Sequence, residues 1–206
     1  MTLHTLILAA GEGRRFGGDL KQLACVDERT LLELCVDKAC ALTPNRVSIV
    51  LGYEAKQLSP RVGQVHQVIN SDWSRGIGNS IACGVAALPR SASAVLIVLC
   101  DQVALSLADL GRLRECYEQL IYADKGVDVP IVCATYAGGQ GVPAIIPRRL
   151  FGELRALDGD LGAKKLLSSH PFVGLAMPQA AIDIDTQEDL VQFRAALVRA
   201  FPYRLT

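Results

Sequence analysis

The sequence predicts an α/β fold in which helices cover both faces of a doubly wound, mainly parallel sheet. Four almost continuous apolar runs have the composition of strands buried on both faces, at residues 3–10, 46–52, 64–70 and 94–100. Stretches with helical periodicity alternate with these runs, at residues 30–42, 77–88 and 106–121. Strands that alternate with helices favour a parallel sheet, because each parallel connection has to cross over the sheet.

The starts of the helices have their own sequence signal. A Ser or Thr followed three residues later by an acidic residue has the spacing of a capping box, in which each side chain bonds the other's backbone N–H. Three pairs have this spacing: Thr30 with Glu33, Ser106 with Asp109, and Thr186 with Asp189. The third pair predicts a C-terminal helix that extends to residue 201.

The alternation of strands and helices changes near residue 130. VPIVCATY (129–136) and VPAIIP (142–147) have the pattern of two strands joined by the Gly-rich loop AGGQG (137–141). We therefore expect residues 130–180 to form an insertion that covers the open edge of the site, on the acceptor side. Just before it, ADKGVD (123–128) predicts an exposed loop.

The composition predicts a single domain that spans residues 1–206. With 206 residues, 50% of them hydrophobic, the chain can bury one large core. Its 21 basic and 21 acidic residues balance, so no overall field draws it to nucleic acid or to an anionic membrane. No apolar run reaches the roughly 20 residues of a membrane span, and no signal-peptide pattern is present, so we expect a cytoplasmic protein.

The seven cysteines are scattered along the chain without a C-x-x-C pair. This spacing argues against a zinc site or a redox dithiol. Several of them stand inside apolar runs, which predicts reduced, buried thiols that pack as small apolar groups.

The segment LAAGEGRRFGGDLKQL (8–23) follows the first strand and contains four glycines. So much glycine indicates that the backbone approaches a ligand closely, and a loop at this place in a parallel sheet commonly cradles phosphate. Phe16 replaces the third glycine of a dinucleotide motif, and Asp19 occupies the lysine position of a Walker loop. What remains is a cationic glycine loop able to fold over a triphosphate, with a solvated basic turn as the alternative.

Carboxylates follow two other predicted strands. Asp101, in LCDQ (99–102), leaves the fourth strand at the sheet edge where the glycine loop lies. Magnesium is commonly held there by one or two carboxylates together with substrate phosphates. Asp183 and Asp185, two residues apart, share one face of a short C-terminal strand. The alternatives are a strand-end turn for Asp101 and helix capping for Asp185.

Five segments resemble, in this order, the MobA-like NTP transferases: LAAGEGRRFGGDLKQL, GIGNSIACGV, LCDQ, GDLGAKKLL and DIDTQEDL. Within that group the chain is most similar to the molybdenum cofactor cytidylyltransferases, from about residue 3 to residue 195. The resemblance implies a Rossmann-like domain that transfers a nucleotidyl group from an NTP, CTP being favoured, to a phosphate-bearing acceptor such as molybdopterin. It implies Mg²⁺ as cofactor, release of pyrophosphate, and transient contact with a molybdoenzyme or its chaperone.

The resemblance also implies roles for individual residues. In the family, the loop after the first strand contacts the base and the phosphates, two cations bind phosphate, and an Asn and a Ser line the base and ribose. The matching nucleotide-binding residues are Leu8, Ala9, Ala10, Gly11, Gly13, Arg15, Lys21, Asn70, Ser80 and Asp101. The two alanines are similar to the cytidine-using branch of the family.

Asp101 matches the metal-binding aspartate of the family, and Asp185 matches a second carboxylate near the metal, with Asp183 as the alternative. The catalytic residues implied are Arg15, Lys21 and Asp101. The acceptor-binding residues implied are Gly141, Pro143, Gly159, Asp160, Gly162 and Lys164. Family members often carry His where this chain has Val142, and Pro where it has Val103, which leaves the identity of the acceptor open.

The composition permits a mechanism without a general base. None of the three histidines, His4, His66 and His170, ends a predicted strand beside the glycine loop. A terminal phosphate has a second pKa near 6, so the acceptor is already largely dianionic at neutral pH. Positioning and charge neutralisation by Arg15, Lys21 and Mg²⁺ are therefore sufficient for transfer.

Three other functions stay open at this point. A sugar phosphate could replace the pterin as acceptor, and an open polar cleft near residues 138–165 would favour it. The protein could instead be a nucleotide-binding regulator without catalysis. An NAD-dependent dehydrogenase is disfavoured by the missing third glycine.

Overall fold

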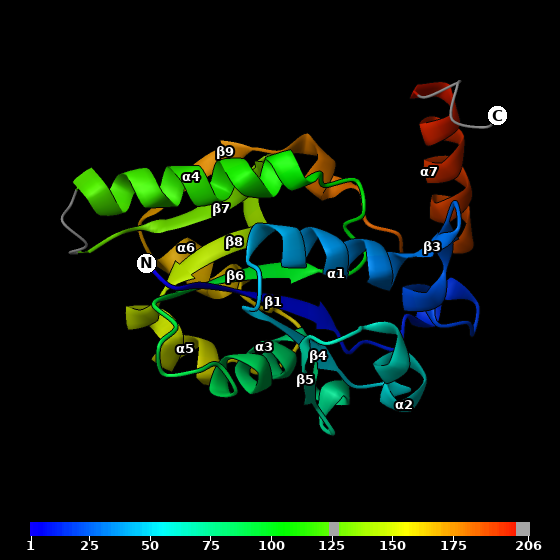
Figure 1. The fold of residues 1–206 in the computed structure, drawn as a ribbon, viewed down its shortest axis with the longest axis horizontal. Helices are drawn as coiled ribbons and strands as arrows, with labels where there is room; N and C mark the ends of the chain where they lie inside the picture. The colour runs from blue at the N-terminus through cyan, green and yellow to red at the C-terminus, as the bar shows by residue number, and fades with distance from the viewer. Residues whose placement is uncertain (124–127, 201–206) are drawn as a thin grey trace.

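The computed structural model describes residues 1–123 and 128–200, and it contains a seven-stranded sheet with the order β5-β4-β1-β6-β8-β7-β9. Four parallel strands form its first half (Figure 1): β1 (Leu3–Ala9), β4 (Val47–Leu51), β5 (His66–Ile69) and β6 (Ala94–Leu99). These are the four apolar runs that the sequence predicts. Because the strands are parallel, their carboxyl ends meet at one edge of the sheet.

The second half of the sheet comes from the segment after residue 130. Strand β8 (Gly139–Pro147) runs antiparallel to both β6 and β7 (Ile131–Tyr136), and β9 (Phe172–Ala176) is parallel to β7. The predicted pair of strands is confirmed, whereas β9 was not predicted. The segment 130–180 therefore continues the main sheet beside β6. The loop expected at 123–128 lies mostly outside the described residues.

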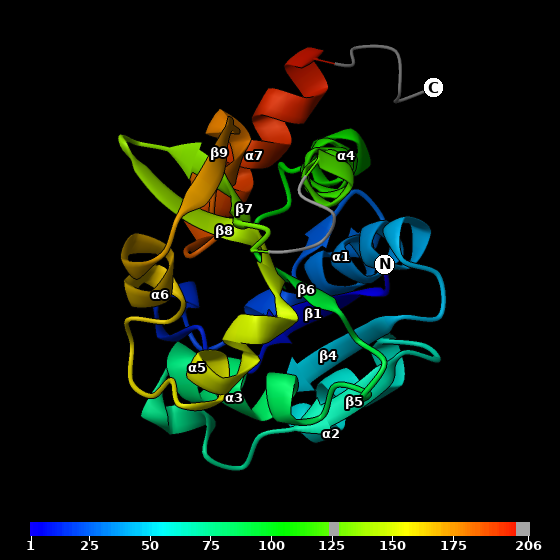
Figure 2. The same cartoon turned by 90° about the vertical axis from the view of Figure 1, so that its left-hand side faces the viewer.

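Helices cover both faces of the sheet, as predicted (Figure 2). The core on one face includes residues of α1 (Leu31–Leu42), α2 (Ala55–Leu58), α4 (Leu107–Ala123) and α7 (Gln187–Ala200). The core on the other face includes residues of α3 (Ile77–Ala86), α5 (Phe151–Arg155) and α6 (Lys164–Ser169). A two-stranded ribbon, β2 (Cys25–Val26) and β3 (Arg29–Thr30), precedes α1. Within the described residues, no helix is long and apolar enough to cross a membrane.

The three predicted capping pairs are present at the starts of α1, α4 and α7. In the first, the Thr30 hydroxyl accepts a hydrogen bond from the Glu33 N–H at 3.1 Å, and the Glu33 carboxylate accepts one from the Thr30 N–H at 2.9 Å. The same reciprocal pattern joins the other two pairs, Ser106 with Asp109 and Thr186 with Asp189. The third pair fixes the chain directly after Asp185.

All seven cysteines are free thiols, and Cys35, Cys100 and Cys133 are buried. Burial raises the pKa of Cys35 to about 12 and that of Cys133 to about 11. These thiols therefore stay protonated at neutral pH and act as small apolar groups.

Two helical glycines differ in the space around them, which gives a test of the packing. A methyl group on Gly84 of α3 would lie 2.7 Å from the side chains of Leu6 and Val50, whereas one on Gly111 of α4 would meet no atom within 4 Å. We predict that Gly84→Ala lowers the free energy of unfolding by about 1–3 kcal/mol through overpacking. Gly111→Ala raises it by about 0.5–1 kcal/mol through helix propensity. Urea denaturation of both variants checks this, and equal stabilisation by both would contradict the packing of α3.

Candidate functional site

The loop after β1 folds back on itself so that Lys21 reaches the edge of the sheet. Gly13 adopts a left-handed conformation with φ of 67°, and a short 3-10 turn (Arg14–Phe16) follows it. A Cβ on Gly13 would lie 3.2 Å from Cγ of Lys21. Glycine is therefore favoured here twice, for the turn and for the passage of the lysine side chain.

The side chain of Gln22 is hydrogen-bonded to the backbone of this loop. This buried side chain donates hydrogen bonds from Nε2 to the carbonyl oxygen of Ala9 at 3.2 Å and to that of Gly11 at 2.8 Å. These two carbonyls belong to the segment expected to contact the nucleotide. Gln22 is not predicted from the sequence, since its role arises only from the way the loop returns to the strand.

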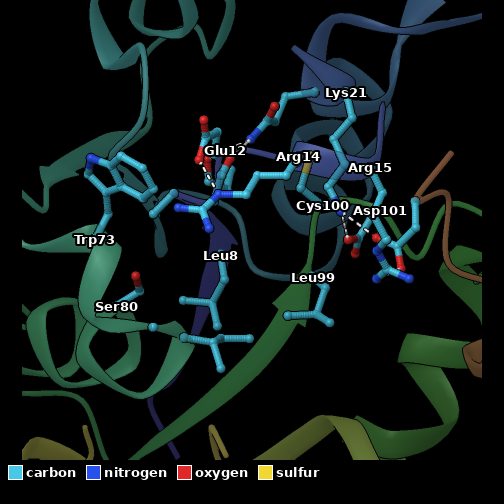
Figure 3. Close-up of a pocket in the computed structure, with 18 of the residues that line it drawn as sticks. Leu8, Glu12, Arg14, Arg15, Lys21, Trp73, Ser80, Leu99, Cys100 and Asp101 are labelled. Atoms are coloured by element: carbon cyan, nitrogen blue, oxygen red, sulfur yellow. Dashed lines mark hydrogen bonds and ion pairs between the residues drawn. The ribbon is translucent and has the colours of Figure 1, made fainter. Parts of the chain in front are cut away.

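One ammonium group joins the loop to two carboxylates (Figure 3). Nζ of Lys21 lies 2.5 Å from Oδ2 of Asp101 and 2.9 Å from Oδ1 of Asp185. Burial alone lowers the pKa of Lys21, but the two carboxylates raise it above its ordinary value, so the amine stays charged. Nη2 of Arg15 adds a bond of 2.6 Å to Asp185, although this arginine is 73% exposed and its ion pair contributes little to stability.

Other contacts fix the two carboxylates relative to each other. The backbone N–H of Ile184 donates to the carbonyl oxygen of Asp101 at 3.2 Å, which ties the strand end to the chain beside Asp185. The side chain of Gln102 donates to the carbonyl oxygens of Val142 at 3.3 Å and Ala180 at 2.8 Å. The end of β6 at Asp101 is therefore bonded both to β8 and to the C-terminal segment that carries Asp185.

Lys38 of α1 anchors the same segment from the helix side. Its Nζ donates to the carbonyl oxygens of Val103 at 3.2 Å and Leu105 at 2.8 Å. Burial lowers the pKa of this lysine. The carbonyl of Val103 is thus held by a half-buried lysine side chain.

The carboxylates fit a divalent cation that also binds phosphate. Oδ1 of Asp101 is buried and has no hydrogen-bond partner within the described residues, so it is an available ligand atom. Among residues 1–123 and 128–200, no group of three or more His, Cys, Asp or Glu side chains is placed to hold a metal ion by itself. A metal at Asp101 and Asp185 would therefore need further ligands from a substrate, as magnesium typically does.

Asp183 lies near this pair. Partial desolvation, followed by the negative charges of Asp101 and Asp185, raises the pKa of Asp183 to about 6, although part of the residue is exposed to solvent. Three carboxyl groups therefore lie close together at this site, and a bound cation would reduce the repulsion between their negative charges.

A cavity of about 480 Å³ lies above this cluster, between the loop and α3. Most of the predicted nucleotide-binding residues line it: Leu8, Ala9, Ala10, Gly11, Gly13, Arg15, Lys21, Ser80 and Asp101, together with Asp185. Asn70 does not line it. Its buried side chain lies behind Ser80 and donates a hydrogen bond of 3.1 Å to the Ser80 hydroxyl.

A second cavity, of about 430 Å³, adjoins the first and shares Leu8, Ile77, Leu99 and Asp160 with it. Of the predicted acceptor residues, Gly141, Asp160, Gly162 and Lys164 line this cavity. Pro143 and Gly159 do not.

Gly159 supports the wall instead. Its carbonyl oxygen accepts a hydrogen bond of 2.8 Å from the N–H of Gly78, and a Cβ on Gly78 would lie 2.8 Å from the backbone of Asp158. The loop before α6 is thus packed backbone to backbone against the start of α3.

Several lining residues of the first cavity were not predicted from the sequence. They are Glu12, Gln22, Trp73, Ser74, Gly76 and Ile77. The segment SDWSRGIG (71–78), which connects β5 to the first residues of α3, carries four of them. The position of this segment directly after a parallel strand could have identified it, because loops that follow parallel strands lie at the same sheet edge as the glycine loop.

A glycine loop that faces carboxylates across the carboxyl edge of a parallel sheet is typical of nucleotide-handling α/β proteins. Residues 5–173 match the family model of the MobA-like NTP transferase domain. The chain therefore belongs to the MobA-like NTP transferase family, a family of nucleotidyltransferases, and the resemblance seen in its motifs is confirmed.

Individual relatives are similar over nearly the whole chain. The chain is 30% identical over 195 residues to nicotine blue oxidoreductase of Paenarthrobacter nicotinovorans, covering 90% of this chain and 93% of that protein. The structure of Rv0371c from Mycobacterium tuberculosis H37Rv superposes with a TM-score of 0.80 and 28% identity, covering 95% of this chain and 98% of that one. Another structure of Rv0371c, in complex with manganese, has a TM-score of 0.76 and 26% identity, covering 95% and 100%.

The position of Lys21 predicts competition between its ammonium and a divalent cation. We expect Lys21→Gln to bind Mn²⁺ alone about tenfold more tightly than the wild type, because a positive charge is removed from between the ligand oxygens. Electron paramagnetic resonance of free Mn²⁺ measures this affinity. Lys164→Gln, a charge change in the second cavity, is the matched control. An unchanged or weaker affinity in Lys21→Gln would show that the two carboxylates do not form the metal site.

Proposed function

We propose that this protein transfers a nucleotidyl group, CMP from CTP in the favoured case, to a phosphate-bearing acceptor and releases pyrophosphate. The observation that carries the proposal is the contact of Lys21 with Asp101 and Asp185 at the floor of the first cavity. Family membership supports the reaction class. The cytoplasm is the expected site of this reaction.

The reaction requires one bond to form and one to break. An oxygen of the acceptor phosphate attacks the α-phosphorus of the NTP, and the bond from that phosphorus to the bridging oxygen of the β-phosphate breaks. The electron pair leaves on pyrophosphate. No proton has to be removed from the acceptor, since its phosphate is already dianionic. This agrees with the lining of the two cavities, which contains no histidine among the described residues.

The cations of the loop would neutralise the leaving group. Lys21 is buried enough for its charge to act strongly on a phosphate, whereas Arg15 reaches the same place from the solvent side. Magnesium held by Asp101 and Asp185 would supply the charge neutralisation that two anionic reactants need. The backbone from Leu8 to Gly13 would contact the base and phosphates, and Ser80, held by Asn70, would line the base and ribose.

The second cavity would hold the acceptor, and its wall favours a flat heterocycle over a sugar. The lining is mostly apolar, with Ile77, Ile81, Leu99, Val142, Leu161 and Leu167 among its side chains. Lys164, at the rim, would bind an acceptor phosphate. Gly141 packs against Tyr136, because a Cβ at this position would clash with the tyrosine hydroxyl in its present place.

A molybdopterin-type acceptor fits this apolar wall better than a sugar phosphate, for which we expected an open polar cleft. The nucleotide-bearing product would then pass to a molybdoenzyme or its chaperone. This step implies a transient protein contact.

A second candidate function is redox chemistry. The observation in its favour is the 30% identity, over almost the full length, to a protein named as an oxidoreductase. Phe16 argues against this function, because it is buried in the loop at the place where a dinucleotide motif has its third glycine.

A non-catalytic nucleotide-binding protein would require neither the metal site nor the second cavity.

The proposed reaction gives a direct prediction for Asp101. Pyrophosphate release is measured with Mg²⁺, molybdopterin and each of CTP, GTP, ATP and UTP, and CTP is expected to be the best donor. Asp101→Asn lowers kcat by at least roughly 100-fold, because the metal loses its most buried ligand, and circular dichroism stays unchanged. Asp37→Asn, an exposed change on α1, is the control and keeps full activity.

Full activity of Asp101→Asn would refute the role of this carboxylate. Absence of pyrophosphate with every NTP, together with oxidation of NADH or NADPH by the wild type when an electron-accepting dye is added, would support the redox function instead.

A further inference from the structure

The first cavity has two chemically different ends. One end carries the ion pairs of Lys21 with Asp101 and Asp185, where a triphosphate would be bound under the proposed function. The other end is formed by the segment between β5 and α3, and Figure 3 shows Trp73 there, across the cavity from Lys21 and Asp101. A nucleotide whose phosphates lie at the charged end therefore places its base near Trp73.

Trp73 is the one aromatic side chain that lines this cavity within the described residues. It is half-buried, so one part of the indole packs on the protein and another part faces the cavity. Tryptophan offers a large flat surface with few rotatable bonds, which makes it effective in stacking on other rings.

The ring is held firmly on its protein side. A Cβ on Gly52 would lie 2.5 Å from Cβ of Trp73, so only glycine allows this close approach. The indole meets the ring of Tyr53 edge to face, with centroids 5.3 Å apart and an interplanar angle of 69°. The N–H of Tyr53 in turn donates to the carbonyl oxygen of Ala10 at 3.0 Å. Trp73 is thus fixed relative to the loop that would contact the nucleotide.

Arg14 lies on the other side of the same space. Its guanidinium extends from the loop toward Trp73 in Figure 3, and its ion pair is with Glu12 at 2.7 Å. The side chain is 80% exposed, so this pair contributes little and leaves Arg14 free to rearrange. Arg14 and Trp73 both line this cavity, so a nucleobase bound there would have an exposed cation as well as the indole among its neighbours.

We propose that Trp73 binds the nucleobase of the NTP by stacking, a contact that rests on the proposed function. Every base has an aromatic face, so this contact adds affinity for the nucleoside part without selecting among the bases. Selection then falls to the loop backbone and to Ser80. The pre-formed position of the ring means that little ordering is needed on binding.

The test uses the fact that Trp73 is the only tryptophan of the chain. Its fluorescence is recorded while the wild type is titrated with CTP and Mg²⁺, or with tripolyphosphate and Mg²⁺, and calorimetry measures both affinities. We expect CTP to quench the emission, and tripolyphosphate to bind without quenching, because only CTP carries a ring.

Two variants complete the test. Trp73→Ala weakens CTP binding by about tenfold or more and leaves tripolyphosphate binding unchanged, whereas Trp73→Phe keeps CTP binding within about threefold. Normal CTP binding by Trp73→Ala, or CTP binding without a fluorescence change, would overturn the stacking. Equal loss of CTP and tripolyphosphate binding would also overturn it, since the residue would then only support the fold. If the wild type binds no NTP at all, the proposed function itself fails.

Discussion

The site depends on a single ammonium group held between two carboxylates. Lys21, Asp101 and Asp185 come from three distant parts of the chain, and the contact between them closes the loop onto the sheet edge. Two aspartates this close to one lysine would repel each other without it. Because Lys21 and Asp101 are largely buried, removing either partner leaves a poorly solvated charge behind. Lys21 therefore places a positive charge of the protein where the proposed function would bind a metal ion.

The rest of the fold keeps this contact in place. Gln22 holds the start of the loop, Gln102 and Lys38 hold the segment after Asp101, and the capping pair at α7 fixes the chain after Asp185. Each of these side chains bonds backbone groups, so the geometry of the site is set by the strands and helices. The nucleoside end of the cavity is anchored in the same manner, through Gly52 and Tyr53.

The sequence predicts the sheet, the helix starts and the convergence of the glycine loop with Asp101, because hydrophobic period, capping pairs and strand direction are local signals with fixed consequences. It does not predict β9, whose alternating burial gives a weak pattern, or the antiparallel direction of β8. The sequence also does not predict that Asn70 and Gly159 lie behind the cavity walls, because the distance of a residue from a cavity depends on tertiary packing. Trp73 and Gln22 were missed for the same reason.

Membership of the MobA-like NTP transferase family defines the reaction class, and a relative named as an oxidoreductase shows why the site itself must be tested. The most direct measurement is electron–nuclear double resonance on protein with ¹³C-labelled aspartate, Mn²⁺ and CTP. The account predicts that one bound Mn²⁺ couples both to ¹³C of a protein carboxylate and to ³¹P of the nucleotide. A ³¹P coupling identical to that of Mn²⁺–CTP in solution, without any ¹³C coupling, would contradict it.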